Sequence, residues 1–103
     1  MLYVADDIAS LSALVNLEEL ILFNLRINDI IPLSGLTVLT WLNLGHNQIQ
    51  DISPLSNLTN LEALFLENNR IIDLSPLSGL TTLSGLFRNK LITVLNIASF
   101  SKN

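Results

Sequence analysis

A pattern of leucine, isoleucine, asparagine and proline recurs along this chain every 22 residues, and it constrains the fold more than any other feature. Each aliphatic position has an aliphatic counterpart one period later. The central positions are Leu36, Leu39, Leu42, Leu44, Asn47, Ile49, Ile52 and Leu55, followed by Leu58, Leu61, Leu64, Leu66, Asn69, Ile71, Leu74 and Leu77. A unit this short cannot bury its apolar face alone, so neighbouring units stack, and the chain is predicted to be a solenoid.

The spacing L-x-x-L-x-L-x-x-N within each unit is typical of leucine-rich repeats. Alternation of leucine with other residues predicts half-buried parallel strands at 19–23, 41–45 and 63–67 on the concave face. Pro32, Pro54 and Pro76 predict loops or single 3₁₀ turns on the opposite side, because proline removes a backbone donor and restricts the preceding residue. The predicted fold class is an α/β solenoid of leucine-rich repeats, with a parallel β-sheet on the concave face, loops and 3₁₀ turns on the convex face, and little or no α-helix.

The asparagines at the end of each predicted strand are expected to form a buried ladder of side-chain amides that bonds to the backbone of the turns. Asn47 and Asn69 hold this position, but Leu25 stands there in the preceding repeat. A leucine cannot accept or donate these bonds. The turn at Leu25 is therefore predicted to be locally altered, with Asn24 as the candidate for a partial substitute.

The chain of 103 residues is predicted to be a single leucine-rich-repeat domain. It divides into a partial repeat at 1–13, three repeats at 14–35, 36–57 and 58–79, and a degenerate final repeat at 80–103. A two-residue deletion restores the pattern of the last repeat and places Asn89 under Asn69. No polar cap is recognised at either end, which leaves leucine-rich surface and a strand edge at both ends.

Composition excludes several classes of function. A net charge of −4 and the lack of a basic run argue against nucleic-acid binding. Without cysteine there is no disulfide framework and no thiolate metal site. The apolar residues are dispersed, so no membrane-spanning segment is expected. Asp6 and Asp7 stand where a secretory signal would carry basic residues, and no such signal is expected.

The exposed strand positions project together from the concave face and are the candidate binding site. Four of the five Trp and Phe side chains fall on these positions, together with Ile21, so an apolar patch is expected on solvent. Such patches mark interaction surfaces, and Trp is a favoured anchor. The flanking residues are expected to form a polar, solvated rim: Glu19, Glu67, Arg26, Arg70 and His46. The predicted partner-binding residues are Ile21, Phe23, Trp41, Asn43, His46, Phe65, Glu67 and Phe87.

Catalysis and metal binding find little support in the residues. His46 has no serine or cysteine placed to act as its nucleophile, so no catalytic residue is assigned and the chain is not expected to be an enzyme. Asp29, Asp51 and Asp73 form one acidic position per turn. Local hydrogen bonding of the turn is the more frequent use of such residues, so neither a metal site nor a cofactor is predicted.

The phrase D-I-S-P-L-S-N-L-T-N-L at 51–61, joined to x-L-x-L-x-x-N-x-I, closely resembles the 22-residue repeats of bacterial internalins. The resemblance covers about residues 5–97. It implies a secreted or cell-surface origin, although the compartment stays unknown from the residues. The helical cap, the immunoglobulin-like region and the sorting signal of internalins are not recognised here.

Two functions are compatible with these features. The first is a protein-interaction module that binds an unidentified protein partner through the concave face. Regulation of an enzyme by docking, as in the related leucine-rich subunit of protein phosphatase 1, would use the same mechanism. The alternative is a structural fragment or self-assembling array, a homo-oligomer whose uncapped ends pair with no external ligand.

Overall fold

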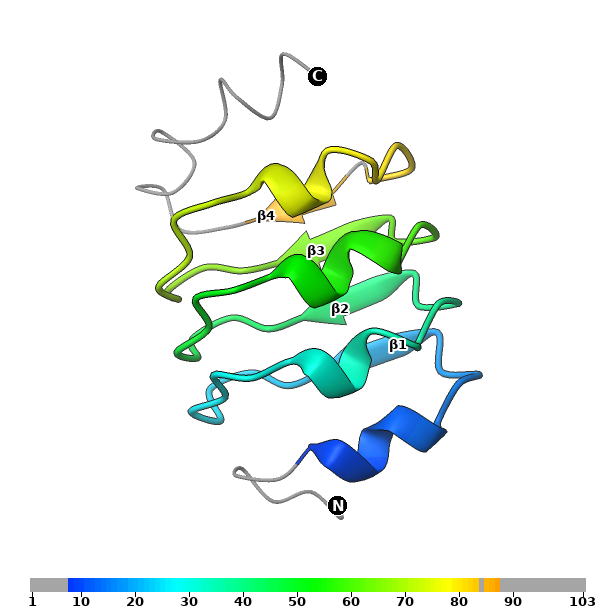
Figure 1. The fold of residues 1–103 in the computed structure, drawn as a ribbon, viewed down its shortest axis with the longest axis horizontal. Helices are drawn as coiled ribbons and strands as arrows, with labels where there is room; N and C mark the ends of the chain where they lie inside the picture. The colour runs from blue at the N-terminus through cyan, green and yellow to red at the C-terminus, as the bar shows by residue number, and fades with distance from the viewer. Residues whose placement is uncertain (1–7, 84, 88–103) are drawn as a thin grey trace.

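The computed structural model describes residues 8–83 and 85–87, which form stacked turns with a strand on one side and a 3₁₀ helix on the other (Figure 1). The strands are β1 (Glu19–Ile21), β2 (Trp41–Asn43), β3 (Ala63–Phe65) and β4 (Gly85–Phe87). They form one parallel sheet in chain order, with Glu19 paired to Trp41, Trp41 to Ala63 and Ala63 to Gly85. Every pair joins residues 22 positions apart, as the repeat predicts.

Each strand has three residues, whereas the alternation predicts strands of five. The hydrogen bonds between turns nevertheless continue past the strand ends. Leu22 N donates to Asn43 O at 2.8 Å and Asn24 N donates to Gly45 O at 3.0 Å. His46 N likewise donates to Glu67 O at 2.8 Å. The side chains that follow the strands are therefore held in register as firmly as those within them.

The convex side carries four short 3₁₀ helices, η1 (Ala9–Ala13), η2 (Ile31–Leu33), η3 (Ser53–Asn57) and η4 (Ser75–Leu77), and the described residues form no α-helix. The prolines of η2, η3 and η4 lie in the first two positions, where a helix needs no donor. The aspartate before each proline accepts a hydrogen bond from the backbone two residues later, at 2.9 Å in the bond from Ile31 N to Asp29. The expected turn function of Asp29, Asp51 and Asp73 is confirmed.

The leucines and isoleucines of the repeat form one continuous core between the sheet and the 3₁₀ helices. Those of the central turns, Leu42 and Leu64 among them, are fully buried, whereas Leu17, Leu20 and Leu25 of the first repeat are only partly buried. At roughly 25 cal/mol per Å² of apolar area, this burial is the main stabilising term of the fold. The hydropathy of the chain thus reflects a solenoid core, and no helix in the described ranges is long and apolar enough to cross a membrane.

The predicted ladder of asparagine amides is present. The Asn47 carbonyl accepts from Leu25 N at 2.9 Å and from Ile27 N at 3.0 Å, and its amide nitrogen donates to Leu22 O at 2.8 Å and Leu44 O at 2.9 Å. Asn69 repeats the arrangement by accepting from Ile49 N at 3.0 Å. Each amide therefore bonds both to its own turn and to the preceding one, and satisfies backbone groups that burial would otherwise leave unpaired.

The turn at Leu25 is altered, as expected, but the change lies in the backbone. Asn24, His46 and Asn68 occupy the same place in successive turns and all have φ between 57° and 60°. In the first turn Arg26 has φ of 59° as well, and its counterparts Gln48 and Arg70 do not. Within residues 8–83 no side-chain hydrogen bond of Asn24 replaces the missing amide, so the expected substitution by Asn24 is not seen.

The predicted partial repeat at 1–13 is described only from Ile8 onward. Of the final repeat at 80–103, the structure describes residues 80–83 and the backbone of β4. The two-residue deletion and the predicted place of Asn89 lie outside the described residues.

Candidate functional site

Three large apolar side chains on the concave face are exposed to solvent. Ile21 is 64% exposed, Phe23 43% and Trp41 41%. They alternate along the chain with Leu20, Leu22 and Leu42, which point into the core, so the strand pleat alone directs them outward. Phe65 on β3 is half-buried and its ring centroid lies 5.2 Å from that of Trp41, at an interplanar angle of 45°. The predicted apolar patch is thus assembled from β1, β2 and β3.

A second ring contact borders this patch at the turn edge. The Phe23 and His46 ring centroids are 4.8 Å apart, at an interplanar angle of 54°. The His46 Nε2 lies 2.9 Å from the Asn68 amide nitrogen, which makes Nε2 the acceptor of this pair. His46 is therefore held from two sides, by a ring of the preceding turn and by an amide of the following one.

Asn43 and Ala63, at outward-facing strand positions, contribute less to this surface than the strand alternation predicts. Asn43 is half-buried, and its side-chain carbonyl accepts a hydrogen bond from Gly45 N at 2.9 Å. Its amide therefore closes the turn after β2 and is only partly available to a partner. Ala63, which stands next to Trp41 in the same column, is 6% exposed and adds little to the surface.

Glu67 was expected to be a solvated rim residue, but it is half-buried. Its carboxylate lies directly over Gly45 of the neighbouring turn. A Cβ atom added at Gly45 would come within 2.6 Å of Oε2 and 3.1 Å of Oε1. The Oε1 oxygen is buried and accepts no hydrogen bond from any described residue. Sequence reasoning missed this contact, although the 22-residue offset between a glycine and a glutamate was a readable signal.

Phe87 completes the predicted set. Its backbone pairs with that of Phe65 in the register of β3 and β4, but the structure does not describe its side chain. The structure therefore brings Ile21, Phe23, Trp41, His46 and Phe65 to one surface, with Asn43 and Glu67 partly buried within it.

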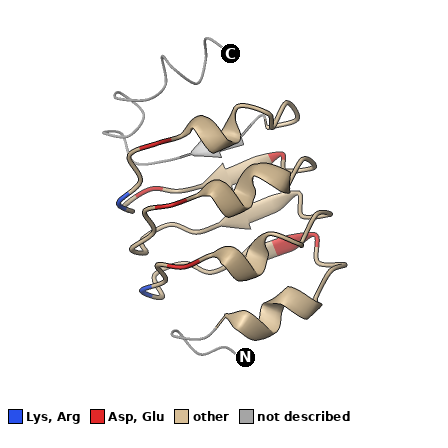
Figure 2. Ribbon diagram, viewed as in Figure 1, with Lys and Arg blue, Asp and Glu red and all other residues tan. Residues whose placement is uncertain are grey.

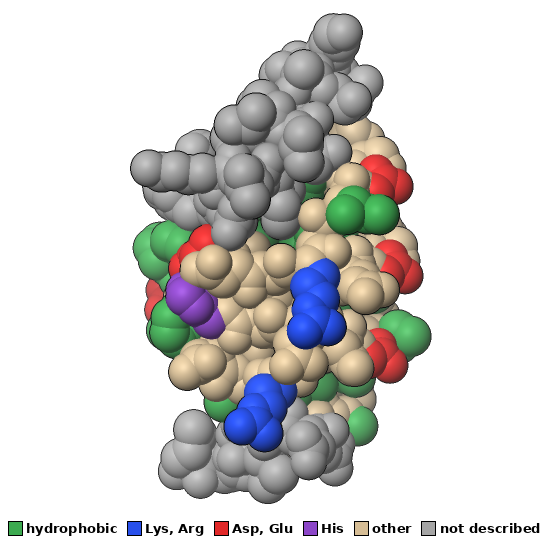
Figure 3. All heavy atoms as spheres, turned by 90° about the vertical axis from the view of Figure 1, so that its left-hand side faces the viewer, with side chains coloured by type: hydrophobic (Ala, Val, Ile, Leu, Met, Phe, Trp, Pro, Cys, Tyr) green, Lys and Arg blue, Asp and Glu red, His purple; other side chains and the backbone are tan. Residues whose placement is uncertain are grey.

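Charge is unevenly distributed around this surface. The segments 17–24, 39–46 and 61–68, which carry β1 to β3 and their ends, contain no lysine or arginine and four glutamates: Glu18, Glu19, Glu62 and Glu67. Arg26 and Arg70 follow the turns, and Figure 2 shows the basic positions at that edge of the ribbon. In Figure 3 the same edge carries arginine side chains in its middle. The imidazole lies to one side with hydrophobic and acidic side chains around it, and acidic side chains interspersed with hydrophobic ones lie to the other.

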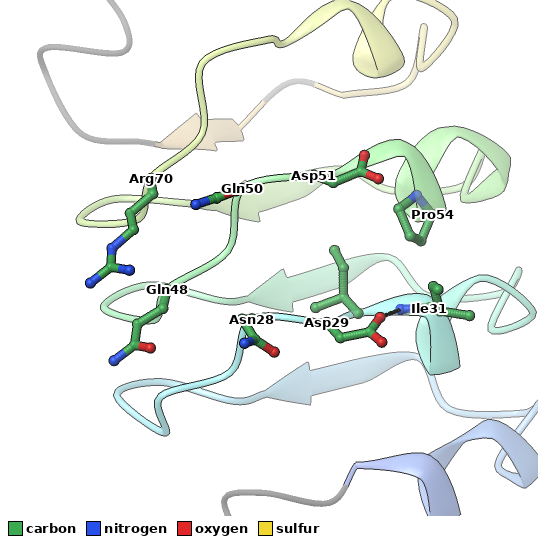
Figure 4. A pocket seen from close by; sticks show the side chains of 9 residues that line it. Asn28, Asp29, Ile31, Gln48, Gln50, Asp51, Pro54 and Arg70 are labelled. Carbon is green, nitrogen blue, oxygen red and sulfur yellow. Dashed lines mark hydrogen bonds between the residues drawn. The ribbon is translucent and has the colours of Figure 1, made fainter.

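A groove of about 480 Å³ lies on the other side of the turn edge, toward the 3₁₀ helices (Figure 4). Its polar lining comes from successive turns and includes Asp29, Gln48, Gln50, Asp51 and Arg70. Asp29 and Asp51 are committed to the backbone bonds that begin η2 and η3. Among the described residues, no three His, Cys, Asp or Glu side chains are placed to hold a metal ion.

Comparison with known proteins identifies the repeat and its relatives. Residues 37–79 match the family described as Leucine Rich repeats (2 copies). The solved structure of internalin C2 from Listeria monocytogenes is 40% identical, with a TM-score of 0.79 over 81% of this chain and 37% of that one. Internalin F of the same organism is 33% identical, with a TM-score of 0.66 over 81% of this chain and 31% of that one.

The chain spans about a third of the length of these two structures. No curated protein gives a significant match. Leucine-rich-repeat proteins of this kind are in general protein-interaction modules and typically have no enzymatic activity. The parallel open sheet, the 3₁₀ turns, the asparagine ladder and the sequence identity agree, and the chain is an internalin-like leucine-rich-repeat protein.

Proposed function

We propose that this protein binds another protein through its concave face, with Trp41 as the central anchor. The observation that carries the proposal is the exposure of Ile21, Phe23 and Trp41 on the concave side of two neighbouring turns, over leucines that are buried or partly buried. Exposed apolar side chains are common singly, but a contiguous group on a rigid sheet usually marks an interaction surface.

The rings are positioned before any partner arrives. Trp41 contacts Phe65, and Phe23 contacts His46, so each ring is restrained by a neighbour from another turn. The backbone beneath them is held by bonds between turns, such as that from Leu44 N to Phe65 O at 2.9 Å. A surface ordered in this way loses little conformational entropy on binding, which leaves more of the contact energy for affinity. Glu19, Arg26 and Arg70 would supply the polar rim.

The test compares Trp41→Ala with a matched control on a binder that is selected from a random 12-residue peptide library displayed on phage. Since a central Trp anchor contributes at least about 2 kcal/mol, Trp41→Ala should raise the dissociation constant about 30-fold. Ile72→Ala is the control, because Ile72 is an 82% exposed apolar residue outside the sheet. Circular dichroism spectra of both variants should match that of the unchanged protein. Equal affinity of Trp41→Ala and the unchanged protein contradicts the proposal.

A second copy of the chain is the competing occupant of the same surface. Size-exclusion chromatography with light scattering, over a dilution series, separates the two cases. A mass near 11.4 kDa at all concentrations supports a foreign partner. A dimer that Trp41→Ala dissociates would instead assign the concave face to self-association, whereas a dimer insensitive to Trp41→Ala would assign self-association to another surface.

A further inference from the structure

The most unusual polar group of the described residues is the Glu67 carboxylate. Its Oε1 oxygen is buried, yet no described residue donates a hydrogen bond to it. Neither Arg70, three residues later in the same turn, nor Arg26, two turns earlier, pairs with it. An ionised oxygen without a donor is unfavourable in a folded protein, because burial removes water without replacing its hydrogen bonds.

The position of this carboxylate follows from the glycine beside it. Phe23, Gly45 and Glu67 hold the same position in successive turns, so toward the N-terminal turns the nearest side chain at this position is that of Phe23, beyond Gly45. The Glu67 side chain lies across the space that any other residue at 45 would fill, with Oε2 within 2.6 Å of the place of a Cβ atom. The carboxylate therefore lies at the turn end of the apolar patch, on the side where Phe23 and His46 form their ring contact.

The surroundings favour a cation at this point. The segments 17–24, 39–46 and 61–68, which carry β1 to β3, contribute four glutamates and no basic residue. Aromatic rings on the same surface, including Phe23 and Trp41, present faces that attract a guanidinium group. Arginine is weakly hydrated, stacks on rings and donates two parallel hydrogen bonds to a carboxylate, so it suits a half-buried acid at the end of an aromatic patch better than lysine does.

We infer that the partner places an arginine side chain against the Glu67 carboxylate, at the turn end of the aromatic patch. The inference rests on the proposed function and adds the chemistry of the partner: an apolar segment for Trp41 with an arginine beside it. The partner's arginine would supply the donor that this oxygen lacks among the described residues, so the acid supplies specificity more than stability.

The experiment uses the peptides selected on the unchanged protein. Their sequences should be enriched in arginine next to aromatic or aliphatic residues. Replacing that arginine with citrulline, which has nearly the same shape without the charge, should weaken binding to the unchanged protein at least tenfold. On Glu67→Gln the arginine and citrulline peptides should bind within about twofold of each other, because the carboxylate that distinguishes them is gone. Selected peptides without a basic residue, or an undiminished arginine preference of Glu67→Gln, would overturn the inference.

Two further readouts separate binding from a structural function of Glu67. Glu67→Gln should keep or raise the Tm, by up to about 4 °C, since it removes an unpaired buried charge; a clear drop in Tm would instead indicate a structural function. Gly45→Ala should displace the carboxylate at little cost in stability, because the group it meets is the end of a flexible side chain and Gly45 has no positive φ. It should weaken the arginine peptide severalfold and leave the citrulline peptide unchanged, and equal affinity for the arginine peptide would contradict the placement over Gly45.

Failure of this inference and failure of the proposed function give different results. If Trp41→Ala weakens binding and Glu67→Gln does not affect the arginine preference, the concave face binds a partner without the ion pair. If neither variant changes the affinity of any selected peptide, or if no peptide is selected at all, both proposals are wrong.

Discussion

The turn after β1 and the turn after β2 are built on the same 22-residue template, yet they are held in different ways. At Asn47 a buried amide bonds to five backbone groups of two turns. At Leu25 the side chain is half-buried and apolar, and the backbone adopts positive φ at both Asn24 and Arg26. The comparison shows that the turn survives without its own amide, but with a second residue in the left-handed region, which is unfavourable for a side chain other than glycine.

The largest effect should come from removing the amide where it is present. Asn47→Leu leaves four buried or partly buried backbone groups without that partner: Leu25 N, Ile27 N, Leu22 O and Leu44 O. The free energy of unfolding should therefore fall by about 4 kcal/mol. Urea denaturation measures the loss. Asn69→Leu is the comparison within the ladder, and it should cost less because Asn69 is only half-buried. A loss below about 1 kcal/mol for Asn47→Leu would show that the two turns do not differ as described.

A smaller effect should follow from relieving the first turn. Arg26→Gly removes the side chain at φ of 59°, and this gain should exceed the greater chain entropy of glycine in the unfolded state. The expected increase in the free energy of unfolding is about 0.5 kcal/mol. Gln48→Gly is the matched control, because the same position of the next turn has no positive φ, and it should lose about 1 kcal/mol. Equal losses in the two variants would show that Arg26 carries no strain.

The smallest effect concerns the convex limb. Hydrogen bonds from the Ser75 backbone and then from its side chain lower the pKa of Asp73 below its ordinary value of 3.8. A lowered folded pKa means that the ionised carboxylate stabilises the fold above the ordinary value, and that this contribution is lost as pH falls through the folded pKa. NMR titration of the Asp73 carboxyl carbon should give a midpoint below 3.8. Ser75→Ala should move this midpoint only part of the way back, because the backbone bond remains; a full return would contradict the assigned order of causes.

Periodicity was sufficient to predict the strands, their register, the buried leucines and the bonding of Asn47, because all of these depend only on spacing along the chain. It was also sufficient to place Trp41 and Phe23 on the exposed side of the sheet. The same reasoning could not give the state of Glu67, because that depends on how far a flexible side chain leans over a neighbouring glycine. Nor could it give the positive φ of Arg26, which is found only in the turn where Leu25 replaces the asparagine.

Asn43 and Ala63 show the same limit on the binding surface. Both residues hold strand positions that the alternation predicts to be exposed to solvent. Asn43, however, closes its turn by accepting a hydrogen bond from Gly45 N, and Ala63 is buried. The prediction from strand alternation assumes that each outward side chain contacts only water. Large neighbours such as Trp41 change that, since they extend over adjacent turns.

The ladder of amides also has a direction. Asn47 forms three of its bonds with the turn that precedes it in the chain, through Leu22 O, Leu25 N and Ile27 N. Substitution of this asparagine therefore removes hydrogen bonds from the preceding repeat as well as from its own. A mutation in one repeat therefore weakens the repeat 22 residues earlier in the chain. Selection on such arrays should act on pairs of adjacent repeats, because the bonds of each asparagine span two of them.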